Sequence, residues 1–170
     1  MTMAIKSTSD LLGQLPSVRG ELRAYVPLAR YTWFRVGGPA EVLFTPADSD
    51  DLSGFLQGCP KNIPITVIGL GSNLLIRDGG IPGVVIRLVR GLSVVRCVGA
   101  EIVVGAGALN LRVSRLAASA GIGGLEFLSG VPGSIGGAVI MNAGAYGQDV
   151  SDVLVSAVVI DRAGLSWKRT

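Results

Sequence analysis

Two glycine-rich segments of the sequence contain the residues best suited to binding an anion through the backbone. The first, "VIGLGSNLLI", occupies residues 67–76 and places Gly69 and Gly71 after an apolar run, followed by Ser72 and Asn73. Glycine lets the backbone approach a ligand closely, and successive unpaired N–H groups form a concave site for an anion. The pattern favours a diphosphate, although a tight turn between two strands would use the same glycines.

The second segment, "GVPGSIGGAVIMNAGAYG", occupies residues 130–147 and has almost no side chain that could act as an acid, base or nucleophile. Its glycines leave the backbone bare where a flat or charged ligand would lie, while Ser134 offers a hydroxyl and Asn142 an amide. Ser134 is not a hydrolase nucleophile, because Pro132 stands where a GxSxG motif needs its first glycine and no histidine could activate the serine. We interpret the segment as a binding surface; a compact loop without a ligand is the alternative.

Together the two segments suit a ligand with a diphosphate and a planar end, such as a dinucleotide cofactor. Neither is a Rossmann fingerprint, since Leu74 stands where a third glycine would follow Gly69 and Gly71, and no GxxxxGK[ST] motif occurs. The absence of histidine excludes Ser-His and Cys-His dyads and histidine metal sites, and two separated cysteines cannot form a zinc or iron–sulfur site. Chemistry must therefore come from a cofactor, from hydroxyl groups, or from lysine, arginine and carboxylate side chains.

Charge and hydropathy limit which classes of binding partner and which cellular compartment are expected. The net charge is +3, but the basic residues are scattered and are not interleaved with aromatic residues, which argues against a nucleic-acid partner. No apolar run approaches the roughly 20 residues of a membrane helix, and the N-terminus lacks the apolar region of a secretory signal. We expect a cytoplasmic protein without a membrane partner.

The elements that must position the two segments form an α+β pattern. A meander of short strands is expected in the middle of the chain, with a hairpin turn at Gly99-Ala100. The other elements expected are a helix over Ser9–Leu15, a strand over Glu41–Thr45, a helix from Asp48 or Ser49 to about Gly58, strands over Ile65–Ile68, Leu74–Ile76 and Val84–Leu88, a helix over Leu109–Ala120, and a strand over Val153–Asp161.

The helix over Leu109–Ala120 is expected to bury one face, composed of Leu109, Val113, Leu116 and Ala120. A boundary between two lobes is expected near Pro60–Pro64, where a helix ends and the strand series begins. The expected division is an N-terminal segment over 1–30, the first part of a small lobe over 31–62, and a larger lobe over 63–170.

Three stretches carry a family resemblance when their order and spacing are considered together: "YTWFRVGGPAEVL", "VIGLGSNLLIRDGGIPGVVI" and "GLEFLSGVPGSIGGAVIMNAGAYG". From about Tyr31 to its end, the chain resembles the UDP-N-acetylenolpyruvoylglucosamine reductase family of flavoenzymes. The resemblance implies an FAD-binding domain of the vanillyl-alcohol-oxidase (PCMH) type, in which two α/β lobes enclose a non-covalently bound FAD.

The resemblance also implies roles for particular residues. Asn142 and Gly144 would lie towards the flavin ring, and Tyr146 would reach the substrate, although an ordinary packed aromatic is an equally good interpretation of Tyr146. From its chemistry rather than from the resemblance, Arg35 would anchor either a phosphate or the fold, since a forked guanidinium suits both, and the structural role is favoured. One side of the FAD pyrophosphate would be held by Gly69, Gly71, Ser72, Asn73 and Leu74, and the other side by Pro132, Gly133, Ser134, Gly136 and Gly137.

In the resembling family, NADPH reduces FAD, and the reduced flavin converts UDP-N-acetylglucosamine enolpyruvate to UDP-N-acetylmuramate for peptidoglycan synthesis. The resemblance places the family's catalytic arginine, serine and glutamate beyond Thr170, so no catalytic residue is assigned. By the same comparison, the larger lobe over 63–170 is expected to be incomplete at its C-terminus, the substrate domain is expected to be absent, and the chain alone is expected to be inactive. The alternatives are another flavoprotein oxidoreductase of the same fold and a non-catalytic nucleotide-binding module.

Overall fold

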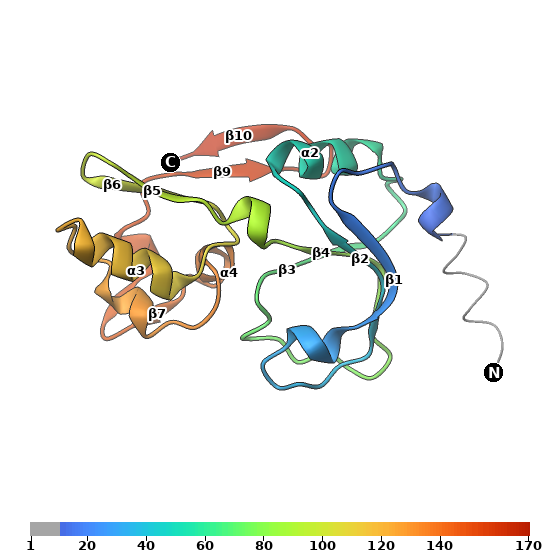
Figure 1. Cartoon of the computed structure of the whole chain (residues 1–170), viewed down its shortest axis with the longest axis horizontal. Coiled ribbons are helices and arrows are strands. Elements are labelled where there is room, and N and C mark those ends of the chain that lie inside the picture. Colours follow the sequence, from blue (N-terminus) through green and yellow to red (C-terminus); the bar gives the residue numbers. More distant parts are fainter. Residues whose placement is uncertain (1–10) are drawn as a thin grey trace.

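A four-stranded mixed sheet forms the core of the first lobe. The structure, a computed structural model, describes residues 11–170. The strands lie in the order β1-β2-β4-β3, with β1 antiparallel to β2, and with β2 and β3 both parallel to β4 (Figure 1). Their bounds are Glu21–Pro27 for β1, Pro39–Thr45 for β2, Ile65–Ile68 for β3 and Ile81–Arg87 for β4.

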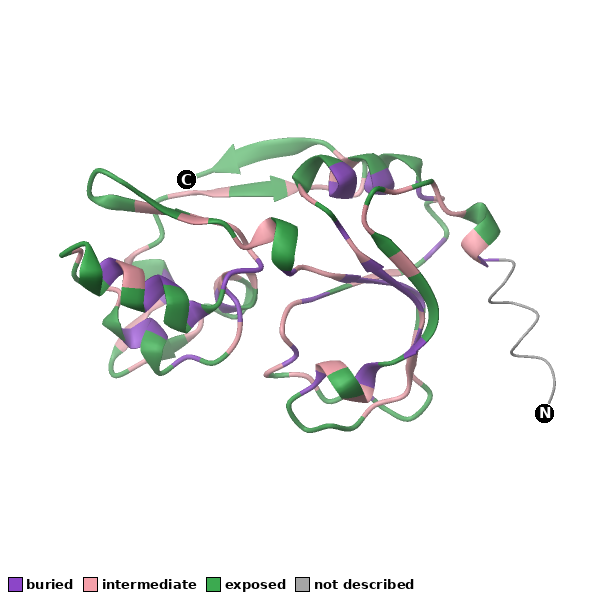
Figure 2. Ribbon diagram, in the orientation of Figure 1, coloured by how far each residue is buried: buried purple, intermediate pink, exposed green. Residues whose placement is uncertain are grey.

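The two central strands are covered on both faces, which is why their sequences are nearly continuous apolar runs. On one face, Phe44 and Ile86 pack against Phe55 of helix α2 (Ser49–Gly58), and the Phe44 and Phe55 ring centroids lie 4.3 Å apart. On the other face, Leu43 and Val85 pack with side chains that include those of Leu28, Ile68 and Ile76. Buried residues gather on these strands in Figure 2.

The first turn of α2 is fixed by two carboxylates. Asp48 accepts a hydrogen bond from the backbone N of Asp51 at 2.9 Å, as an N-cap does. Asp51 in turn accepts from the backbone N of Arg19 at 2.7 Å and from those of Gly20 and Ala47 at 2.9 Å each. Burial opposes ionisation of Asp51, but these N–H donors outweigh it and hold the pKa of its carboxyl below the usual value. The chain that enters β1 is thereby held against the start of the helix.

The second lobe is built from short elements around a separate apolar core. Phe127, Leu128, Val113, Ala138 and Val150 are buried together in this core. The elements are η2 (Arg90–Leu92), β5 (Val95–Val98), β6 (Glu101–Val104), α3 (Asn110–Ser119), η3 (Glu126–Ser129), α4 (Ile135–Met141), β7 (Gly144–Ala145), β8 (Gln148–Asp149) and η4 (Val150–Asp152).

A hairpin of β9 (Ala157–Ile160) and β10 (Ser166–Arg169) then returns to the first lobe. In Figure 1 it extends across the molecule to α2, and Ile160 packs against the α2 side of the sheet. Nη2 of Arg162 donates to the carbonyl oxygens of Pro60 at 3.0 Å and Ile63 at 2.7 Å. The Arg162 carbonyl oxygen accepts from Nζ of Lys61 at 2.6 Å.

Most of the expected elements are confirmed. The strand over Glu41–Thr45 lies within β2, the helix capped by Asp48 is α2, and Gly99-Ala100 connects the strands of a hairpin, β5 and β6. Of the expected helix over Ser9–Leu15, residues 11–14 are helical, and Ser9 and Asp10 lie outside the described residues.

The expected meander is wrong, because β3 and β4 run parallel and the connection over 69–80 crosses back before β4 begins. Leu74–Ile76 is irregular within this connection and forms no strand. The strand expected over Val153–Asp161 is shorter, because β9 covers only Ala157–Ile160. Glycine turns and apolar runs fit a hairpin and a crossover equally well, so the sequence pattern could not separate them.

The buried face of α3 also differs from the expected one. Asn110, Val113, Ser114 and Ala117 are buried, whereas Leu109 is 51% exposed and Ala120 is also exposed. Asn110 is buried because its Nδ2 donates to the Val131 carbonyl oxygen at 3.1 Å. A periodicity of apolar residues alone misses such polar positions.

The packing of the four-stranded sheet limits where the boundary between the lobes can lie. Val42 and Phe44 pack in one cluster with Val84 and Ile86, so this core continues across the boundary expected near Pro60–Pro64. We therefore propose placing the division after Leu88, where the chain leaves the sheet for η2.

Candidate functional site

The first glycine segment begins where β3 ends, at the carboxyl edge of the parallel strands. Gly71 has a φ of +68°, and a Cβ there would overlap the carbonyl oxygen of Tyr31. The carbonyl oxygen of Gly71 accepts from the backbone N of Trp33 at 3.1 Å. This tight contact explains why glycine is required at position 71.

The backbone donors of this segment are unengaged. Within residues 11–170, none of the backbone N–H groups from Gly69 through Leu74 donates a hydrogen bond to another protein group. Backbone N–H groups that lack a protein acceptor need water or a ligand as a partner. A run of six such groups beside bare glycines suits the oxygens of a diphosphate.

The second glycine segment is fastened to the chain that enters α3. The backbone N of Ile135 donates to the Ala108 carbonyl oxygen at 2.9 Å, and that of Gly136 donates to the Ala106 carbonyl oxygen at 2.8 Å. A Cβ at Gly136 would lie 2.9 Å from the Cβ of Ala106. These donors are already engaged; among the described residues, the N–H groups of Gly133, Ser134 and Gly137 have no protein acceptor.

The structure brings these two segments together. A Cβ at Gly69 would overlap Oγ of Ser134, and a Cβ at Gly133 would lie 2.7 Å from Oγ of Ser72. Oγ of Ser72 donates to the Pro132 carbonyl oxygen at 3.3 Å. One segment belongs to each lobe, so the candidate site lies where the lobes meet.

The remaining predicted site residues have local structural roles. Asn142 ends α4 in the left-handed conformation, with a φ of +41°, and its Oδ1 accepts from the backbone N of Ser151 at 2.9 Å. Gly144 lies in β7, where a Cβ would be 2.7 Å from the Gln148 carbonyl oxygen. Tyr146 is 85% exposed, and its ring lies against Gly130. Their assignments to the flavin and the substrate stay predictions.

A carboxylate supports the turn after Asn142. The Asp149 side chain accepts from Oγ of Ser151 at 2.6 Å and from its backbone N at 2.9 Å. The hydroxyl of Ser151 is the main cause that holds the pKa of Asp149 below its usual value, and the backbone donors add to it. Asn142 and Asp149 therefore share one donor, the Ser151 amide.

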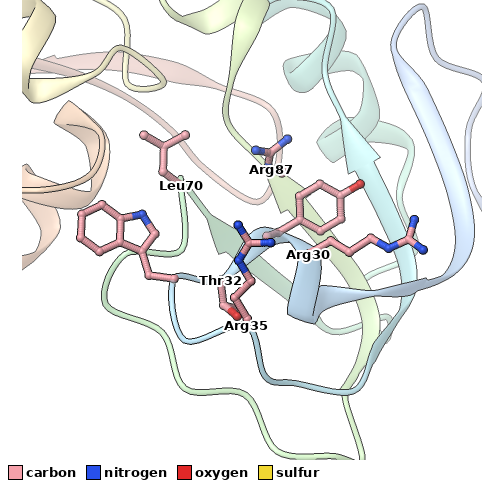
Figure 3. A pocket seen from close by; sticks show the side chains of 7 residues that line it. Arg30, Thr32, Arg35, Leu70 and Arg87 are labelled. Carbon is pink, nitrogen blue, oxygen red and sulfur yellow. The ribbon is translucent and has the colours of Figure 1, made fainter.

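Two hollows open beside the first glycine segment, with volumes of about 370 and 350 Å³. Leu70 and Arg87 line both. In Figure 3 the side chains of Arg35 and Arg87 lie in the first hollow, while Arg30 extends away from Leu70. Arg90 and Arg112 line the second hollow. The arginines at 87, 90 and 112 were missed in the sequence because isolated arginines form no motif; only their nearness to strand and helix ends could have indicated them.

Two features were not found in the part of the chain that the structure describes: a metal-binding cluster and a membrane-spanning helix. No group of histidine, cysteine, aspartate or glutamate side chains is arranged to hold a metal ion. No described helix has the length and apolar character that crossing a membrane would require.

The chain matches a family model described as "FAD binding domain" over residues 40–168. It is 59% identical over 162 residues to the UDP-N-acetylenolpyruvoylglucosamine reductase of Parvibaculum lavamentivorans. These aligned residues make up 95% of this chain and 52% of that protein. It is 55% identical to the enzyme of the same name from Paramagnetospirillum magneticum, with 95% and 53% covered.

A solved structure gives the same result. The crystal structure of UDP-N-acetylenolpyruvylglucosamine reductase from Thermus caldophilus matches with a TM-score of 0.73 and 36% identity, over 90% of this chain and 53% of that one. The predicted resemblance and the mixed α/β fold are confirmed. The chain spans about half the length of the relatives that it matches.

Proposed function

Because this chain belongs to the FAD binding domain family, we propose that its two glycine segments hold FAD where the lobes meet. The observation that carries this proposal is the run of unengaged N–H groups from Gly69 through Leu74, placed against the second segment at Ser134. Backbone donors are well suited to a diphosphate, and glycines let the cofactor approach. The residues present therefore fit the cofactor.

We assign the diphosphate to the first segment. Gly69, Gly71, Ser72, Asn73 and Leu74 would hold it through N–H groups, and the Pro132–Gly137 stretch would form the opposite wall. Asn142 and Gly144 would lie towards the flavin end, and Tyr146 towards a substrate. When bound, FAD supplies hydride transfer, and the chain supplies binding, orientation and shielding from water.

We further propose that the complete activity is the NADPH-driven reduction of UDP-N-acetylglucosamine enolpyruvate to UDP-N-acetylmuramate, a step in peptidoglycan precursor synthesis. Similarity to reductases from several bacteria supports the assignment. This chain would supply the FAD-binding part of the enzyme.

Cofactor retention tests the first proposal. The purified chain is incubated with FAD and desalted, and the flavin absorbance band and flavin fluorescence of the protein fraction are then measured. We expect a retained flavin band in the wild-type chain and a large loss in Gly71→Ala, whose Cβ would overlap the Tyr31 carbonyl oxygen. A folded wild-type chain that leaves the column colourless would contradict FAD binding.

A chimera tests the substrate assignment. This chain replaces the matching half of the Parvibaculum lavamentivorans reductase, to which it is 59% identical. We expect NADPH oxidation that depends on the enolpyruvyl nucleotide. A flavin-loaded chimera that oxidises NADPH at the same rate without that nucleotide would instead support another flavoprotein oxidoreductase.

A further inference from the structure

Arg87 begins at the same edge of the sheet as the first glycine segment. It is the last residue of β4 and pairs in register with Ile68, the last residue of β3. The backbone N of Leu88 donates to the Ile68 carbonyl oxygen at 2.9 Å, and Gly69 follows directly. In open sheets, ligands bind beyond the carboxyl ends of parallel strands. Arg87 is therefore positioned beside the unengaged N–H groups.

The Arg87 guanidinium is partly desolvated and lacks a counter-charge. Its Cζ lies 4.6 Å from the centroid of the Tyr31 ring, and its Nε is buried without a hydrogen-bond partner in the described part of the chain. The described residues form two ion pairs, Arg19–Asp48 and Arg23–Glu21, and neither includes Arg87. Burial lowers the pKa of Arg87 from its usual value; Tyr31 acts in the opposite direction, and the nearby charges of Arg90 and Arg23 add to the lowering.

Other arginines line the two hollows, which have Arg87 and Leu70 in common. Arg35 lines the first hollow from the loop after η1 (Leu28–Tyr31), while Arg90 and Arg112 line the second hollow from η2 and α3 of the second lobe. No aspartate or glutamate is among the residues that line either hollow. Like charges brought together without a carboxylate repel one another, and a bound polyanion would remove that repulsion.

We propose that Arg87 is the central residue of an anion site between the two hollows, which takes the diphosphate of a nucleotide. Arg35, Arg90 and Arg112 provide the surrounding positive charge. Arginine suits this ligand because its planar group donates paired hydrogen bonds to phosphate oxygens. The diphosphate could belong to FAD, in which case the inference rests on the proposed function, or to a second nucleotide.

Inorganic pyrophosphate titrated into the FAD-free chain, followed by calorimetry, tests the site. We expect binding that weakens with added salt. Arg87→Gln should weaken it roughly tenfold or more, as expected for the loss of hydrogen bonds to a charged group. Arg87→Lys should lie between the two, because it keeps the charge and loses the fork.

Helix α3 offers a matched control. Arg112 and Arg115 are both exposed on it, but only Arg112 lines the hollow. We expect Arg112→Gln to weaken pyrophosphate binding a few-fold, and Arg115→Gln to leave it unchanged. If Arg87→Gln does not fold, the comparison of Arg112→Gln with Arg115→Gln still tests the proposal. No pyrophosphate binding by the wild type, or equal losses at positions 112 and 115, would overturn the proposal.

Competition between FAD and pyrophosphate distinguishes the two sources of the diphosphate. It also distinguishes failure of the anion site from failure of the proposed function. If FAD displaces pyrophosphate and Arg87→Gln weakens both ligands alike, the site holds the diphosphate of the cofactor. If pyrophosphate still binds the FAD-loaded chain through Arg87, the site serves a second nucleotide. If pyrophosphate binds through Arg87 but FAD is never retained, the proposed function fails and the anion site stands. If FAD is retained but pyrophosphate binding ignores Arg87, the anion site fails alone.

Discussion

The two glycine segments look alike in sequence, but the structure uses their backbones differently. The first, from Gly69 to Leu74, leaves six successive N–H groups without an acceptor among residues 11–170. The second engages the N–H groups of Ile135 and Gly136 with carbonyl oxygens from the chain that enters α3. We conclude that segments of similar glycine content can have different roles: the first presents a row of free N–H donors, and the second packs closely against its neighbours.

Gly71→Ala should produce the largest loss. A Cβ at this position would overlap the Tyr31 carbonyl oxygen, and the φ of +68° strains any other residue. We expect the free energy of unfolding to fall by roughly 2–4 kcal/mol, measured by urea denaturation. The control is Gly79→Ala in the same connection, where, apart from its chain neighbours, no atom of the described residues lies within 4 Å of the added Cβ. A Gly71→Ala chain as stable as Gly79→Ala would mean that the segment is not pinned to Tyr31.

Gly69→Ala tests the contact between the segments. Its Cβ would overlap Oγ of Ser134 but would lie at an ordinary 3.6 Å from the Ser134 Cβ. We therefore expect Ser134→Ala to rescue part of the loss, with a coupling free energy of roughly 0.5–2 kcal/mol in a double-mutant cycle of unfolding free energies. Additive losses would show that the two segments do not touch in solution.

Substitutions at Asn142 distinguish a structural role of this residue from a role in binding the cofactor. Asn142→Ala should lower the free energy of unfolding by about 1–2 kcal/mol, since alanine is disfavoured in the left-handed conformation. Asn142→Gly should regain most of this cost, because glycine tolerates a φ of +41°. Retained flavin after desalting is the second measurement. A glycine variant that keeps its stability and loses FAD would show that the amide contacts the cofactor.

Acid should have the smallest effect, confined to the turn held by Asp149. Its carboxyl has a pKa below the usual 3.8 in the folded chain, so its contribution is present above that value and is lost as the pH falls through the folded pKa. We expect the protection of the Ser151 amide from hydrogen exchange to fall as the solution is acidified below about pH 4. Asp149→Asn should remove this pH dependence, whereas Glu101→Gln on the exposed β6 should keep it. An unchanged pH dependence in Asp149→Asn would assign the effect to another group.

The sequence predicted those parts of the fold that local chemistry determines. Asp48 placed the start of α2 because an N-cap is recognised from adjacent residues, and Gly99-Ala100 placed a hairpin for the same reason. The parallel pairing of β3 with β4 was not predictable in this way, because partner and direction depend on residues far apart in the chain. Asn110 was missed because its burial depends on the Val131 carbonyl oxygen, which comes from a distant turn.

The candidate site shows the same division. The two segments could be identified because glycine itself is the signal, and the structure places them together. The engaged donors of the second segment could not be foreseen, since their acceptors at Ala106 and Ala108 are ordinary backbone groups. The position of Arg87 likewise follows from strand register, which a single sequence does not reveal.

The return of the β9–β10 hairpin to α2 has a kinetic consequence. The chain passes from the first lobe to the second after Leu88 and comes back at β9, and Arg162 in the turn between β9 and β10 donates hydrogen bonds to the carbonyl oxygens of Pro60 and Ile63. Two links far apart in the sequence thus join the same pair of lobes, and they leave fewer hinge motions than one link would. We expect a ligand enclosed between the lobes to exchange slowly, at a rate limited by the opening of this fastening.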